Sequence, residues 1–236
     1  MDDRIEDFLE LKIEPDEKFK FHCTQCGDCC SNREDILLSP QDLFRISKKL
    51  NMKPETVLMA YAEAYIGDNS RLPIVRLLPA GANKRCSLLD GCKCVVHDAK
   101  PAMCAMFPIG RILERKDGKT SFIFCYMNPK CGDDSEVHTV REWFESFGIP
   151  LDDPYFKEWS QCIVQLSESV QKIEPYCEKE KMMGIWVTMI NLLYLKYDIE
   201  QPFIPQFRNN CTKMLELMHI AVLNYGPETE GEYHGK

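Results

Sequence analysis

The sequence predicts an α+β protein, predominantly α-helical, in which a small cysteine-cluster module with a β-hairpin precedes a C-terminal three-helix unit. Three observations support this class. Ten of the 13 cysteines lie between Cys23 and Cys131, two β-prone arms flank Asp117-Gly118, and three long helical periods follow residue 138. We therefore expect an acidic N-terminal segment at 1–20, a cysteine-cluster metal-binding domain at 21–137, a helical domain at 138–226 and a disordered tail at 227–236.

Local signals predict the elements of the first half. Ser39 is a suitable N-cap and Pro40 a suitable first helical residue, so LSPQDLFRISKKL predicts a helix. A second helix is expected to begin near Pro54. Because that helix lacks basic residues, we interpret the pair as a packing scaffold and not as a DNA-binding helix-turn-helix. Residues 74–79 form a candidate strand, and GRILERKDGKTSFIFCYM predicts a hairpin.

Three helices are expected in the second half, at about residues 153–173, 178–197 and 205–225. The isolated cysteines of this part, Cys162, Cys177 and Cys211, are interpreted as small core or surface residues. The most apolar run, MMGIWVTMINLLYL, is shorter than the roughly 20 apolar residues that span a bilayer. We therefore expect a buried core helix there and no membrane partner.

Composition and charge exclude some classes of function. The chain has 236 residues and a net charge of -8, and no cluster of Lys and Arg that would neutralise phosphates, so no nucleic-acid partner is expected. The acidic start MDDRIEDFLELKIEPDEK lacks the features of a secretory signal, which predicts a cytoplasmic location. In a reducing cytosol, this density of cysteine indicates metal binding or thiol chemistry and not stable disulfides.

The stretch FHCTQCGDCC carries the strongest chemical signal. Cys23-x-x-Cys26 and Cys26-x-x-Cys29 are overlapping bends that can direct two sulfurs to one ion, and Gly27 frees the turn between them. Side chains of neighbouring residues usually diverge, so Cys29 and Cys30 rarely complete the same tetrahedron. Cys30 could serve a second ion, bridge two metals, stay exchangeable or simply be buried.

The remaining cysteines of the first half strengthen the metal hypothesis. CSLLDGCKC, Cys104, Cys125 and Cys131 add more thiols than one mononuclear ion can use, so either two sites exist or some thiols have another task. Soft sulfur ligands admit zinc, mononuclear iron and an iron–sulfur cluster, and a metal-free thiol function also stays open. The bacterial ferredoxin run is incomplete here, but three spaced thiolates and a distant fourth would still hold a 4Fe-4S cubane.

These residues resemble the CxxCxxCC family of zinc- or iron-chelating cysteine-cluster proteins of bacteria. The resemblance rests on FHCTQCGDCC, on LSPQDLFRISKKL, on Cys86-Ser87-Leu88-Leu89 and on CVVHDAKPAMCAMFPIG, and it covers about residues 20–131. It implies that Phe107-Pro108 shapes the loop behind the ligands. The core ligand set that it implies is Cys23, Cys26, Cys29, Cys30, Cys86, Cys94 and Cys104.

The chain departs from the family pattern at three positions. Lys100 stands where arginine usually precedes Pro101, and Ala105 and His97 stand where arginine and tyrosine are common. Arginine binds carboxylates bidentately and lysine does not. If arginines at these positions bind a substrate or cofactor in the family, the resemblance does not extend that role to this chain. His97 is interpreted as a solvated or capping residue, and Cys92 as an extra thiol.

The family also looks similar to the flagellin lysine N-methylases, which are associated with an iron–sulfur centre and S-adenosylmethionine. In that comparison Cys125 and Cys131 join the metal ligands. We therefore expect a cytosolic protein that holds zinc or iron through thiolates. The alternative is an iron–sulfur enzyme that transfers methyl groups or electrons, with a protein substrate or S-adenosylmethionine as its partner. Its pocket would be lined by Arg76, Arg85, Arg111 or Lys100. A thiol redox role for Cys26 and Cys29 lacks the expected βαβ context.

Overall fold

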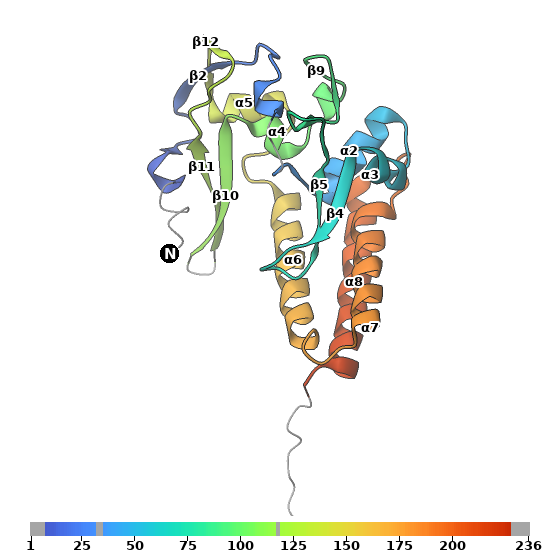
Figure 1. The fold of residues 1–236 in the computed structure, drawn as a ribbon. Helices are drawn as coiled ribbons and strands as arrows, with labels where there is room; N and C mark the ends of the chain where they lie inside the picture. Colours follow the sequence, from blue (N-terminus) through green and yellow to red (C-terminus); the bar gives the residue numbers. More distant parts are fainter. Residues whose placement is uncertain (1–7, 32–34, 117–118, 228–236) are drawn as a thin grey trace, which may run out of the picture.

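The computed structural model describes residues 8–31, 35–116 and 119–227. Small antiparallel sheets and short helices occupy one end of the molecule, and three long helices extend from it (Figure 1). This arrangement confirms the predicted α+β class with a C-terminal three-helix unit. Within the described ranges, no helix combines the length and the apolar character needed to cross a bilayer.

The helices and strands have the following bounds. The helices are α2 (Pro40–Leu50), α3 (Pro54–Tyr61), α4 (Ala102–Met106), α5 (Val140–Ser146), α6 (Pro154–Ile173), α7 (Lys179–Ile190) and α8 (Phe203–Tyr225), with short turns η1 (Asp28–Cys30), η2 (His97–Ala99) and η3 (Asn191–Leu195). The strands are β1 (Lys12–Ile13), β2 (Lys18–His22), β3 (Leu37–Leu38), β4 (Ala62–Ile66), β5 (Pro73–Leu77), β6 (Pro79–Ala80), β7 (Arg85–Cys86), β8 (Leu89–Asp90), β9 (Lys93–Cys94), β10 (Ile109–Lys116), β11 (Lys119–Tyr126) and β12 (Asp133–Thr139).

Most of the predicted elements are present. Ser39 caps α2, and its side chain and that of Asp42 satisfy each other's backbone N–H groups in a capping box. Strands β10 and β11 pair in register from Ile109 with Tyr126 to Lys116 with Lys119, which confirms the hairpin. The predicted Asp-Gly turn between them lies outside the described residues. The second long helix, α7, continues into the π-helical turn η3.

Two hydrophobic cores organise the chain. The first, here called the hairpin core, joins β1, β2, β10, β11, α4 and α5 through buried residues such as Phe19, Phe124 and Phe144. The second, here called the helical core, joins α2, α3 and the β3-β5-β4 sheet to α6, α7 and α8. Helix α5 thus packs with the hairpin although it follows residue 137. The predicted boundary between a domain at 21–137 and a domain at 138–226 stays a prediction.

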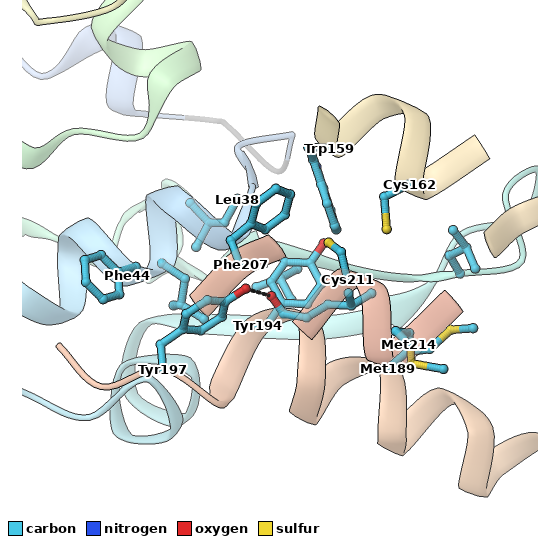
Figure 2. Close-up of a cluster of buried hydrophobic side chains, with 14 of the residues drawn as sticks. Leu38, Phe44, Trp159, Cys162, Met189, Tyr194, Tyr197, Phe207, Cys211 and Met214 are labelled. Atoms are coloured by element: carbon cyan, nitrogen blue, oxygen red, sulfur yellow. Dashed lines mark hydrogen bonds between the residues drawn. The ribbon is translucent and has the colours of Figure 1, made fainter. Parts of the chain in front are cut away.

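The helical core contains two of the isolated cysteines. Figure 2 shows Cys162 on α6 and Cys211 on α8 inside this core, beside Trp159 and Tyr194. Both cysteines are buried, which confirms their interpretation as core residues. The apolar run on α7 and η3 contributes Met182, Met189 and Leu193 to this core, as expected of a core helix. Its other face is open to solvent, because Met183 and Val187 are exposed.

Candidate metal centre

Two adjoining cavities between the cores gather the cysteines of the first half. The large cavity has a volume of about 240 Å³ and is lined by Cys23, Cys26, Cys29, Cys30, Cys92, Cys94, Cys104 and Cys131. The small cavity, of about 60 Å³, is lined by Cys29, Cys30, Cys86, Cys94 and Cys104. The structure therefore brings together every predicted ligand except Cys125.

The first loop turns the chain at two left-handed residues. Gln25 has φ 54° and Gly27 has φ 82°, and the η1 turn follows directly. Within this turn the carbonyl oxygen of Gly27 accepts hydrogen bonds from the Cys30 N–H at 3.1 Å and from the Ser31 hydroxyl at 3.0 Å. The predicted role of Gly27 in freeing the turn is thus confirmed.

Four other segments deliver the remaining predicted ligands. Cys86 and Cys94 end the short strands β7 and β9, and Cys104 lies in α4. Helix α4 is fixed at its start by the Asp42 carboxylate, which accepts the Ala102 N–H at 2.7 Å. Cys131 precedes Gly132, whose φ is 76°, and a Cβ at Gly132 would lie 2.5 Å from the carbonyl oxygen of His22. Glycine at this position lets the Cys131 loop pack against β2.

Crowding and burial keep several of these thiols protonated when no metal is bound. The sulfurs of Cys29 and Cys30 lie 3.8 Å apart, and this contact, together with burial, raises the pKa of Cys30. Burial, with Cys29 and Cys26 nearby, raises the pKa of Cys131 to about 12. Burial also raises the pKa values of Cys86 and Cys94. A cation in the cavity would reverse this preference, because it stabilises the thiolate form.

Cys125 occupies a different environment from the other predicted ligands. It lies in β11 opposite Lys12 and Gly110, and it is completely buried. Burial raises the pKa of its thiol to about 11. Because Cys125 lines neither cavity, the structure separates it from the cluster. Cys92, interpreted from the sequence as an extra thiol, is exposed and lines the large cavity.

Four aromatic side chains, here called the aromatic wall, line the large cavity together with the thiols. They are Phe21, Phe107, Trp143 and Phe147. Trp143 and Phe147 are not among the site residues that the sequence predicts, because helix α5 comes next to the thiol loops only through tertiary packing. The signal in the sequence is the segment that begins at the N-cap residue Thr139 and contains Trp143 and Phe144, which is typical of a helix with one buried face.

The basic residues predicted for a pocket divide into two groups. Lys100 lines both cavities, with its ammonium 5.5 Å from the centre of the Phe147 ring. Arg85 donates to the Gly91 carbonyl at 2.6 Å and lies 3.9 Å from the Cys92 sulfur. Arg76 instead pairs with Glu63, and Arg111 pairs with Asp153 away from the thiols. His97 also lines the large cavity, where burial and Lys100 lower its pKa.

The donor set fits a soft metal. Across residues 8–31, 35–116 and 119–227, no three His, Cys, Asp or Glu side chains already converge as ligands of one ion. The cavities nevertheless bring several thiols together on short loops, and none of the 13 cysteines, all of which are described, forms a disulfide. Thiolate sulfur suits zinc and iron and disfavours calcium and magnesium, so the chemistry of these donors fits zinc or iron.

These features define a class of proteins in which loops supply a cluster of cysteine thiols suited to metal. A comparison with family models agrees: the CxxCxxCC model, described as "Putative zinc- or iron-chelating domain", matches residues 22–132. The match covers a little under half of the chain, and it confirms the resemblance seen in the sequence. No curated protein and no solved structure matches the chain.

Proposed function

We propose that this protein binds zinc or iron through the thiolates of the cysteine cluster. The observation that carries the proposal is that eight of the nine predicted ligands line two adjoining cavities. The family description supports the same chemistry. A reducing, cytoplasmic location belongs to this proposal, because the thiols must stay free of disulfides to bind metal.

The chain's own residues would hold the metal and release protons to solvent. A bound ion would supply positive charge that stabilises the sulfur anions, and each coordinating thiol would lose its proton. Cys30, Cys86, Cys94 and Cys131, whose pKa values are raised, would release protons on binding. Metal binding would also fix the loops between the two cores, so that its free energy adds to the stability of the fold.

The first experiment is elemental analysis of the protein purified without oxygen. Iron, zinc and acid-labile sulfide are measured on one sample, with an absorption spectrum from about 300 to 600 nm. Zinc without colour, or iron with or without sulfide, supports the proposal and identifies the metal. A protein that contains no metal and takes up neither zinc nor iron would overturn it.

Serine variants connect the metal to the cluster. We expect Cys23→Ser, Cys26→Ser and Cys29→Ser to lower the metal content, because a hydroxyl is a much weaker ligand for soft metals than a thiolate. Cys125→Ser is the matched control, since this cysteine lies in the same half of the chain but lines neither cavity. Equal loss of metal in the control would contradict the assignment.

A second candidate is an iron–sulfur enzyme of the methylase type that acts with S-adenosylmethionine. The aromatic wall and Lys100 favour it, because they give the large cavity an apolar side and a cation beside the thiols. Isothermal titration of the iron-loaded protein with S-adenosylmethionine tests this candidate. Saturable binding that Lys100→Ala weakens would support it, and the absence of binding heat to a fully iron-loaded sample would reject it.

A further inference from the structure

We propose that the cluster forms two metal centres, each with four thiolate ligands. The outer centre uses Cys23, Cys26, Cys29 and Cys131, and the inner centre uses Cys30, Cys86, Cys94 and Cys104. This inference rests on the proposed function, because it assumes that the thiols bind metal. It goes further by assigning the number of centres and the ligands of each one.

The two sets of thiols are anchored on different cores. Cys23 packs against the hairpin core, and Gly132, next to Cys131, lies against Phe21 of the same core. The inner cysteines on the other segments, Cys86, Cys94 and Cys104, all pack against the helical core. The hairpin core therefore supports the segments of Cys23 and Cys131, and the helical core supports Cys86, Cys94 and Cys104.

The cavities divide part of the thiols in the same way. Cys23, Cys26 and Cys131 line only the large cavity, whereas Cys86 lines only the small one. The other four thiols, Cys29, Cys30, Cys94 and Cys104, line both cavities.

Cys29 and Cys30 lie at the junction of the two sets. Both residues line both cavities, and their sulfurs are 3.8 Å apart. Because each of the two residues borders both cavities, Cys29 can serve the outer centre and Cys30 the inner one.

Native mass spectrometry of the zinc-loaded full chain tests this inference. We expect two zinc ions per chain in the wild type. Cys131→Ser should lose the outer ion and Cys86→Ser the inner ion, so that each variant keeps one, and the double variant should keep none. Cys125→Ser should keep both, because it lies in the sheet. Circular dichroism of each variant checks that α6, α7 and α8 remain folded.

The wild type provides a second measurement that does not depend on variants. Titration of the metal-free chain with Co²⁺ follows the sulfur-to-cobalt charge-transfer absorption, and we expect it to saturate at two equivalents. Saturation at one equivalent, or one zinc that both single variants abolish, would overturn the two-centre assignment and leave the proposed function intact. Four irons with four sulfides lost together would also overturn it. No binding of any metal would instead overturn the proposed function.

Discussion

The guanidinium of Arg111 on β10 lies 3.2 Å from the carboxylate of Asp153, the residue that caps α6. The Arg111 side chain is 1% exposed and that of Asp153 is 12% exposed, so this ion pair is shielded from water. The rings of Phe122 and Phe156 cover the guanidinium at 4.7 and 4.6 Å. The pair therefore fixes the hairpin to the first turn of the C-terminal helices.

Loss of the Asp153 carboxylate should destabilise the protein strongly. We expect Asp153→Ala to lower the free energy of unfolding by about 3–5 kcal/mol, because it leaves the Arg111 charge buried without its partner. It also removes the acceptor of the Phe156 N–H. Urea unfolding measures the effect. Arg208→Ala is the control, since the exposed Arg208–Glu158 pair should contribute about 1 kcal/mol or less. Similar losses in the two variants would contradict the prediction.

The buried carboxylate of Asp42 should influence metal affinity from outside the cluster. It completes the capping box of α2 and accepts the Ala102 N–H two residues before Cys104. We expect Asp42→Ala to weaken zinc binding by about tenfold, corresponding to roughly 1.4 kcal/mol for one lost anchor of the Cys104 segment. A competition titration with a chromophoric chelator gives the affinity.

The capping box of α5 provides the control for that variant. Glu142 accepts the Thr139 N–H in the same geometry as Asp42 accepts the Ser39 N–H, but Glu142 is exposed and holds no thiol-bearing segment. Glu142→Ala should lower stability without changing zinc affinity. If both variants weaken zinc binding equally, the Asp42 effect arises from general destabilisation.

The Arg71–Glu174 pair should make stability depend on pH in the acidic range. Arg71 lowers the pKa of Glu174 below its usual 4.5. The stabilisation is therefore complete above pH 4.5 and is lost as the pH falls through the lowered, folded-state pKa. Because the pair is partly exposed, we expect Glu174→Gln to cost about 1 kcal/mol or less at pH 7 and less at pH 3 than at pH 7. Urea midpoints at the two pH values measure this difference.

A constant cost of Glu174→Gln across that pH range would contradict the linkage. Glu216→Gln is a suitable control, because it removes one exposed negative charge from α8 instead of from this pair. It should change the midpoint equally little at both pH values.

Metal removal should loosen the thiol loops and leave the helical core folded. Trp143 lines the large cavity and donates its indole N–H to the Met106 carbonyl at 3.0 Å. In a variant that keeps only Trp143, a chelator should shift the fluorescence, because the thiol loops that line the same cavity lose their cross-links. A variant that keeps only Trp186 should respond little, since this indole binds the Arg71 carbonyl outside the cavities. An equal response in both variants would indicate that the whole chain unfolds together.

Several features could be predicted because they depend on residues close together in the sequence. The capped start of α2 requires only Ser39, Pro40 and Asp42, and the turn between two C-x-x-C bends requires only Gly27. Alternating side chains around Asp-Gly predict the hairpin for the same reason. Thiol chemistry itself identifies the class of metal that the cluster suits.

Cys125 and Cys131 show where local patterns stop being sufficient. Both were predicted ligands and they lie six residues apart, yet only Cys131 reaches the cavities. Cys125 is held inside a strand, whose neighbours and burial are set by Lys12 and Gly110 from distant parts of the chain.

By itself, the sequence determined the type of ligand, the bends that present it and the helices that follow, because short-range geometry and side-chain chemistry control all three. Only the tertiary structure decided which thiols meet, which cations stay beside them and which aromatic rings line the same cavity. Arg111 illustrates the reason: its partner Asp153 is 42 residues away, and packing of the hairpin against α6 brings the two together. Contacts of this kind depend on how both cores bury their apolar surfaces, and no local pattern encodes them.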